Sequence, residues 1–202
     1  NAAIYLRKWF CASVININRD YNARGNELCL IFQGTQGNGK NEFVRHIKTV
    51  WESKYTVTHY GALDSKDFCE KLHKVVIIYM DELSALSNTK GIETVKSVLS
   101  QDIVAYRKSY GRELDDHKVY ANFIASTNET HFLADQTGNR RFLVIEAAPR
   151  LIDYKLMPPA THIWGYAKYL VRPGRKRGSL NPHKRNLGKK KNKSLPGERF
   201  LF

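Results

Sequence analysis

The sequence predicts an α/β fold: a mostly parallel β-sheet flanked by helices. Three segments have the character of buried strands: 28–32, 75–80 and a run that leads into Thr127-Asn128. They alternate with segments whose apolar residues recur at helical spacing. Because strands that alternate with helices form βαβ units, this order indicates a parallel sheet with helices on both faces. The 202 residues are enough for one domain with a full core.

The first half of the chain supplies five expected elements. Apolar residues recur at helical spacing from Ala3 to Ile17, which predicts an amphipathic helix within 1–20. A core spanning 27–147 then begins with a buried strand, Leu28 to Phe32, followed by a glycine-rich loop and a helix ending near Trp51. Segment 63–74 is expected to be helical, and the apolar run 75–80 to be a buried strand.

The second half continues the alternation. A helix is expected over 89–101, because Ile92, Val95 and Leu99 share one side. A hairpin arm with a polar tip leads into a buried strand that ends at Thr127. The last strand is expected at Phe142 to Glu146, and a closing helix over 162–171 completes the domain 1–171.

The positive charge is concentrated at the carboxyl end. The net charge is +14, yet residues 172–202 hold 11 Lys and Arg against one acid, while the rest holds 22 against 18. This segment is rich in Gly, Pro, Asn and Lys without periodicity, so we expect it to be disordered or aberrant. The basic balance itself suggests an anionic partner.

Cysteine usage and hydropathy suggest a cytoplasmic protein that does not enter a membrane. The three cysteines are widely spaced, which argues for reduced thiols. No apolar run approaches the roughly 20 residues that span a bilayer. The chain starts at Asn1, so we expect it to be a fragment or an internal domain.

The loop between the first strand and its helix has the spacing of a phosphate-binding loop. Glycines let backbone N–H groups turn inward around a polyphosphate, and the helix adds the positive end of its dipole. The alternative is a glycine-rich turn without a ligand. The residues expected to bind a nucleotide are Gly34, Gly37, Asn38, Gly39, Lys40 and Asn41.

Two of these residues have specific expected roles. Lys40 would place its ammonium group on the β- and γ-phosphates. Asn41 stands where such loops normally carry the Ser or Thr that ligates Mg²⁺. Its amide oxygen is expected to hold the metal, directly or through water, because Mg²⁺ keeps several waters and uses few protein ligands. The alternative is that Asn41 faces solvent and metal binding is weakened.

Polar residues follow two further buried strands. Asp81 comes directly after the strand 75–80 and is expected to orient Mg²⁺ beside the loop. Glu82 is expected to polarise the attacking water. Asn128 is expected to hydrogen-bond the γ-phosphate and that water. The alternatives are two solvated acids that open a loop and an Asn that caps a turn.

Arg140 and Arg141 precede a strand, whereas the other site residues follow strands. In a parallel sheet they would lie at the opposite edge, roughly 16 Å away across a five-residue strand. This indicates an arginine finger given to a neighbouring subunit in a head-to-tail ring. Adjacent strand residues point oppositely, so one of the two would be the finger. The alternative is a surface pair that anchors the strand.

A basic cluster lies at the expected hairpin tip. Arg107, Lys108 and Arg112 are interleaved with Tyr106 and Tyr110. Basic and aromatic side chains together suit single-stranded nucleic acid, through phosphate pairing and base stacking. A solvated hairpin tip is nearly as good an explanation of the composition.

The motifs together resemble the virulence-associated protein E family, phage- and island-encoded ATPases related to superfamily 3 helicases and to phage or plasmid primase-helicases. The resemblance covers about Tyr5 to Val171 and is carried by YLRKWF, GTQGNGK, MDEL, YRKSYGR, STNETHFLADQTGNRRFLV and WGYAKYL. The chain departs from the family pattern at Asn41 and beyond Val171.

This resemblance implies a P-loop NTPase fold with an AAA+-like core that binds ATP and Mg²⁺. It implies a homo-hexamer that translocates on single-stranded DNA. It also implies catalytic roles for Asp81, Glu82, Asn128 and Arg140 or Arg141, and DNA contacts by Arg107, Lys108 and Arg112.

These observations lead us to expect an ATP-dependent DNA helicase-type motor from phage or mobile-element replication. A primase domain or protein outside this chain is an expected partner. One alternative is a nucleotide- or DNA-binding remnant that does not hydrolyse ATP, suggested by Asn41 and the basic tail. The other is a P-loop kinase, a class that seldom needs an Asp-Glu pair, a sensor Asn and an arginine before the last strand.

Overall fold

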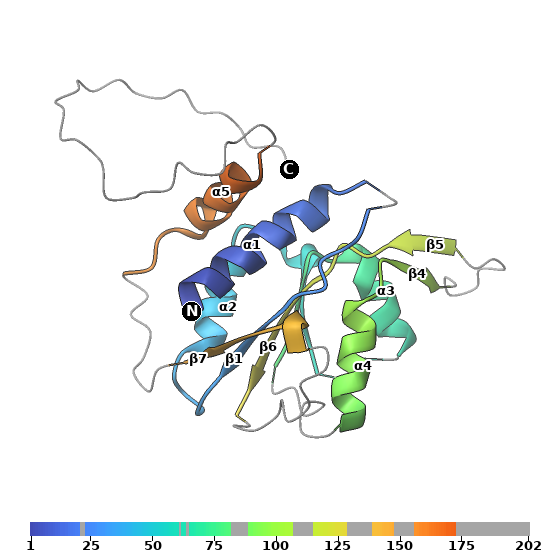
Figure 1. The fold of residues 1–202 in the computed structure, drawn as a ribbon, viewed down its shortest axis with the longest axis horizontal. Helices are drawn as coiled ribbons and strands as arrows, with labels where there is room; N and C mark the ends of the chain where they lie inside the picture. Colours follow the sequence, from blue (N-terminus) through green and yellow to red (C-terminus); the bar gives the residue numbers. More distant parts are fainter. Residues whose placement is uncertain are drawn as a thin grey trace.

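A five-stranded parallel sheet forms the centre of the molecule and confirms the expected α/β class (Figure 1). The computed structural model describes residues 1–20, 23–60, 62–63, 65–81, 89–106, 115–128, 139–147 and 156–172. In spatial order the strands are β2 (Thr56–His59), β3 (Ile77–Met80), β6 (Asn122–Thr127), β1 (Cys29–Gln33) and β7 (Phe142–Glu146).

The strand register places the ends of the central strands side by side. Gln33, the last residue of β1, pairs with Thr127 of β6 and with Glu146 of β7. Met80, the last residue of β3, pairs with Ala125. Because all five strands run in one direction, the segments that leave their carboxyl ends share one edge of the sheet.

Helices cover both faces of the sheet. The helices α1 (Ala2–Asn18), α2 (Lys40–Lys48) and α5 (Ala160–Val171) pack on one face, and α3 (Lys66–Lys74) and α4 (Thr89–Leu99) on the other. Alternate residues of β1 show this division: Leu30 faces the first group and Ile31 the second. The α3 helix begins where Ser65 accepts a hydrogen bond from the Phe68 N–H at 3.2 Å.

Buried indoles tie α1 and α5 to the rest of the fold. The Trp9 Nε1–H donates to the Phe123 carbonyl on β6 at 2.9 Å. The Trp164 Nε1–H donates to the Ile47 carbonyl on α2 at 2.9 Å. Phe10 contacts both rings edge-on. Each indole therefore buries its large apolar area while its one donor keeps a partner.

A buried cluster of asparagines fastens the end of α1 to the sheet. Asn122 is fully buried at the start of β6, and its Oδ1 accepts hydrogen bonds from Asn26 at 3.0 Å and Asn16 at 3.3 Å. Its Nδ2 donates to the Val76 carbonyl at 3.0 Å. The amides satisfy one another where an unpaired polar group would be destabilising.

Element boundaries differ from the expected ones in a few places. The edge strand β2 was not predicted, because its four residues are mostly half-buried and give a weak pattern. The hairpin arm is present as the antiparallel pair β4 (Ile103–Tyr106) and β5 (Asp115–Lys118). The closing helix begins at Ala160, and short 3-10 turns, η1 (Ser53–Tyr55) and η3 (Asn139–Arg141), precede β2 and β7. Among the described helices, none has the length and hydropathy to cross a membrane.

Candidate functional site

The glycine-rich loop leaves β1 and turns directly into α2. Three of its residues, Gly34, Gly37 and Gly39, have φ values of 150°, 83° and 89°. These values lie where an L side chain is strained, so the glycines permit the path of the loop. Gly39 directly precedes Lys40, so the amide groups of the first turn of α2 border the loop.

Asn38 packs its side chain beneath the loop. A Cβ atom at Gly34 would lie 2.6 Å from Nδ2 of Asn38, so only glycine leaves room for this amide. Asn38 is 3% exposed, and neither polar atom of its side chain has a hydrogen-bond partner among the described residues. A buried amide without a partner is destabilising by about 1–3 kcal/mol, which indicates a site where a ligand oxygen can bind.

Lys40 lies across the loop with its ammonium group held by oxygen atoms. It is buried, and Nζ donates to the Asn128 Oδ1 at 3.0 Å, to the Thr35 carbonyl at 3.2 Å and to the Gly34 carbonyl. The bond to Asn128 joins two residues 88 positions apart. The expected juxtaposition of Lys40 with Asn128 is therefore present.

Three donors form hydrogen bonds to the carboxylate of Asp81 at the same edge of the sheet. Its Oδ1 accepts hydrogen bonds from the hydroxyl groups of Tyr79 at 2.8 Å and Ser126 at 2.7 Å. Its Oδ2 accepts one from Nδ2 of Asn41 at 3.2 Å. The Tyr79 hydroxyl also contacts Oδ1 of Asn41. Asn41 is thus adjacent to Asp81, as a shared metal-binding role requires.

Tyr79 and Ser126 are polar residues of this site that the sequence analysis missed. Burial raises the pKa of Tyr79 well above its ordinary value, and the hydrogen bond to Asp81 raises it further, so the phenol is protonated and can donate. Strand periodicity could have revealed both residues. Each lies two positions before a predicted site residue, Asp81 or Asn128, and residues two apart share one face.

These side chains line one cavity of about 280 Å³. Its wall is formed by residues 36–42 together with Asp81, Ser126 and Asn128. Carboxylate and amide oxygens are ligands that suit Mg²⁺. Within the described ranges, no group of three or more His, Cys, Asp or Glu side chains is placed to hold a metal ion.

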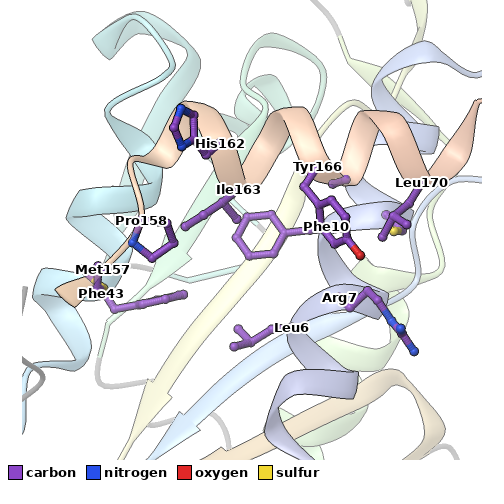
Figure 2. A pocket seen from close by; sticks show the side chains of 12 residues that line it. Leu6, Arg7, Phe10, Phe43, Met157, Pro158, His162, Ile163, Tyr166 and Leu170 are labelled. Carbon is purple, nitrogen blue, oxygen red and sulfur yellow. The ribbon is translucent and has the colours of Figure 1, made fainter. Parts of the chain in front are cut away.

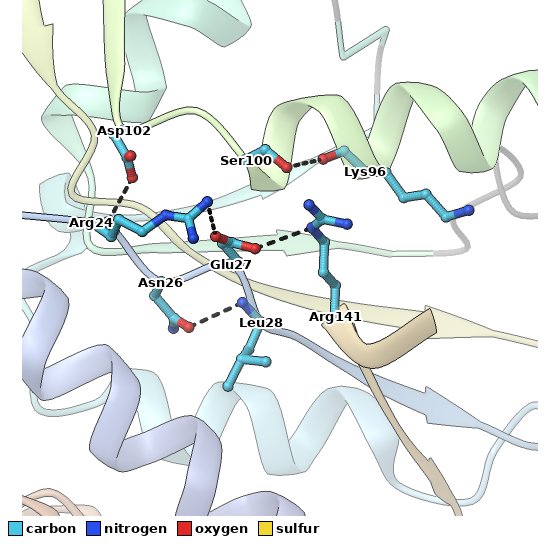
Figure 3. A network of polar contacts seen from close by, with 9 residues as sticks. Arg24, Asn26, Glu27, Leu28, Lys96, Ser100, Asp102 and Arg141 are labelled. Carbon is cyan, nitrogen blue, oxygen red and sulfur yellow. Dashed lines mark hydrogen bonds and ion pairs between the residues drawn. The ribbon is translucent and has the colours of Figure 1, made fainter. Parts of the chain in front are cut away.

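Arg140 and Arg141 lie at the opposite edge of the sheet, as expected. Nε of Arg141 is 3.3 Å from Oε2 of Glu27, whose Oε1 pairs with Arg24 at 2.9 Å (Figure 3). Glu27 precedes β1 and Arg141 precedes β7, so this ion pair joins the starts of neighbouring strands. Arg141 therefore matches the anchoring alternative. Arg140 is exposed, and its use by a neighbouring subunit stays a prediction.

Some predicted residues lie outside the described part of the chain. These are the expected water-activating acid Glu82 and the tail from residue 173 onward, together with the predicted DNA contacts Arg107, Lys108 and Arg112. Of this hairpin, the structure describes the two strands β4 and β5, between which the three basic residues lie in sequence.

The chain belongs to the virulence-associated protein E-like domain family, whose model matches residues 2–195. This result confirms the family resemblance seen in the motifs. A relative described as a DNA primase-polymerase, from Nitratiruptor phage NrS-1, is 29% identical over 150 residues. That match covers 70% of this chain but 21% of the relative, so the chain spans about a fifth of the relative's length.

Solved structures of the NrS-1 C-terminal region have a similar fold. Two apo structures, one described as the A form, match with TM-scores of 0.54 and 0.53, at 23% and 22% identity. Each match covers 84% of this chain and 44% of the other. At this level of identity the likeness concerns the fold alone.

These comparisons correct the expected function. We expected an ATP-dependent DNA helicase-type motor, and this expectation is wrong. The similar protein is described as a DNA primase-polymerase, and the similar structures are of the NrS-1 C-terminal region. The description of this relative names a primase-polymerase and not a helicase motor.

Proposed function

We propose that this chain is the nucleotide-binding module of a phage-type DNA replication protein of the primase-polymerase kind. In this proposal the fold is that of a P-loop NTPase, and the cavity at the carboxyl edge of the sheet holds a nucleoside triphosphate such as ATP with Mg²⁺. The replication role rests on the description of the NrS-1 relative. The observation that carries nucleotide binding is the convergence of Lys40, Asn41, Asp81 and Asn128 on one cavity.

The chemistry of the cavity suits a polyphosphate. Lys40 is its buried cation, and the first turn of α2 adds the positive end of a helix dipole. The unpaired amide of Asn38 offers a donor to a phosphate oxygen. The Lys40 ammonium is now bound to carbonyl oxygens of the loop and to Asn128, acceptors that phosphate oxygens would replace.

The opposite wall of the cavity suits the metal. Asp81 supplies the negative charge, and Asn41 supplies an amide oxygen one residue after Lys40. We propose that these two residues hold Mg²⁺ beside the phosphates, where the metal would neutralise phosphate charge. Asn41 would then act as a neutral substitute for the usual hydroxyl ligand.

DNA is the proposed macromolecular partner. Arg107, Lys108 and Arg112 lie in the segment that joins β4 to β5, and we propose that they contact DNA phosphates. The NrS-1 relative is described as a DNA primase-polymerase, which supports DNA as the substrate of the whole protein. This chain would be one part of that protein.

Calorimetric titration with ATP, in Mg²⁺ and in EDTA, tests nucleotide binding. We expect Lys40→Ala to weaken binding at least ten-fold under both conditions, because it removes the buried cation. Asp81→Asn should weaken binding mainly in Mg²⁺. The control is Lys48→Ala, at the other end of α2, which should bind as the wild type does. The proposal fails if the wild type does not bind ATP, or if Lys40→Ala binds it equally well.

A further inference from the structure

A second cavity lies between α1, α5 and the start of α2. Its volume is about 480 Å³, within the range of about 300–1,000 Å³ usual for small-molecule sites. Figure 2 shows Leu6 and Phe10 of α1 on one side and Ile163 and Tyr166 of α5 on the other, with Phe43 and Pro158 at one end. We call this cavity the α1/α5 pocket.

The α1/α5 pocket and the phosphate cavity meet at the first turn of α2. Phe43 lines the α1/α5 pocket, while Lys40, Asn41 and Glu42 line the phosphate cavity. An α-helix rises 1.5 Å per residue, so Phe43 lies about 4.5 Å along the axis from Lys40. Lining residues of the two cavities are thus sequence neighbours on this turn, which is the arrangement that a molecule with a charged part and a separate apolar part would need.

The lining of the α1/α5 pocket suits a flat aromatic ring. Phe10, Phe43 and Tyr166 supply aromatic faces or edges, and aliphatic side chains fill the space between them. Arg7 and His162 are the basic side chains among the lining residues, and both are exposed. Tyr166 itself is 48% exposed, so its ring borders the α1/α5 pocket where the pocket opens to solvent.

We propose that the α1/α5 pocket holds the base of the nucleotide whose phosphates bind at the loop, an inference that rests on the proposed function. The base stacks on Tyr166, and the ribose spans the first turn of α2 beside Phe43. Stacking on aromatic side chains accepts every base, because each base has a π-face. The largely apolar lining therefore suits contact with the flat faces of a base.

The test compares ATP with inorganic tripolyphosphate, which has the phosphates but no base. Calorimetric titrations of both, in Mg²⁺, are made on the wild type and on Tyr166→Ala. We expect Tyr166→Ala to weaken ATP binding about ten-fold, the range seen when a stacked aromatic is removed, and to change tripolyphosphate binding less than two-fold. Tyr166→Phe keeps the ring and should bind ATP within two-fold of the wild type.

The matched control is Tyr169→Ala. Tyr169 lies one turn further along α5 and is 51% exposed, but it does not line the pocket. Its ring stacks with that of Tyr166, with centroids 6.5 Å apart, so its removal should weaken ATP binding far less than removal of Tyr166 and leave tripolyphosphate binding unchanged. If Tyr166→Ala binds ATP as well as Tyr169→Ala does, or loses tripolyphosphate to the same degree, the base-binding inference is wrong. If the wild type binds neither ligand, the phosphate site itself is wrong.

Discussion

The hydroxyl of Tyr79 lies 2.8 Å from Oδ1 of Asp81 and also contacts Oδ1 of Asn41. One phenol proton serves two acceptor oxygens, and the Ser126 hydroxyl donates to the same carboxylate oxygen. Oxygen atoms from two strands and one helix therefore converge beside the phosphate cavity. Such a convergence of oxygen ligands suits a hard cation, and Tyr79 fixes the orientation of the two proposed ligands.

Removal of that hydroxyl should affect the metal more than the nucleotide. In Tyr79→Phe we expect the Mg²⁺ concentration that gives half-maximal ATP binding to rise several-fold, because Asp81 and Asn41 lose a shared donor. Binding in EDTA should stay within two-fold of the wild type. The free energy of unfolding should fall by about 1 kcal/mol, the usual net value of one hydrogen bond. An unchanged Mg²⁺ titration would show that Tyr79 has no role in orienting the ligands.

Gly34 should tolerate no side chain. Its φ is 150°, and an added Cβ would lie 2.6 Å from Nδ2 of Asn38 and 3.2 Å from the Ala147 carbonyl. We expect Gly34→Ala to lower the free energy of unfolding by about 1–3 kcal/mol and to weaken ATP binding, measured by urea denaturation and calorimetry.

Gly37→Ala is the comparison for Gly34→Ala. Gly37 also has a positive φ, of 83°, but a Cβ there meets nothing within 4 Å. It should therefore lose less stability than Gly34→Ala. Equal losses would mean that backbone strain alone, and not contact with Asn38, explains the glycine at position 34.

His73 should make stability depend on pH. His73 on α3 stacks on His117 of β5, with ring centroids 4.4 Å apart. Burial lowers the pKa of His73 below its ordinary value of about 6.5, and His117 and Lys74 lower it further, against an opposing effect of Glu70. The unfolded chain then binds the proton more tightly, so stability is fully present above about pH 6.5 and decreases as the pH falls toward the folded pKa.

Replacement of His73 tests this dependence. In His73→Gln, urea denaturation should show a smaller loss of stability between about pH 7 and pH 5 than in the wild type. A His73→Gln protein with the wild-type slope would contradict the prediction.

The buried asparagine cluster should be important for folding. Asn122→Ala leaves the amides of Asn16 and Asn26 without their shared acceptor and removes a donor to the Val76 carbonyl. We expect a loss of about 2–3 kcal/mol in the free energy of unfolding. Asn18→Ala removes an exposed amide that bonds only within α1, and it should cost well under 1 kcal/mol. Similar losses in both variants would contradict the role of burial.

Periodicity and local motifs in the sequence were sufficient to predict the sheet and the edge of the sheet at which the site residues lie. The alternation of apolar strands with helices was sufficient to predict the sheet, because a buried strand must be apolar on both faces. The parallel direction of the strands then required that Lys40, Asp81 and Asn128 meet at one edge, and that Arg141 lie at the other. The β2 strand was not predicted because its four residues, mostly half-buried, lie at the edge of the sheet.

Tertiary structure alone decided which side chains touch. Ser126 contacts Asp81 because β3 and β6 are neighbours in the sheet, although the two residues lie 45 positions apart. Glu27 pairs with Arg141 because β1 lies beside β7. The α1/α5 pocket exists because α1 and α5 pack on the same face of the sheet. Phe43 of α2 lines this pocket and follows directly on residues that line the phosphate cavity. Contacts between distant segments depend on strand order and helix packing, which a local pattern does not encode.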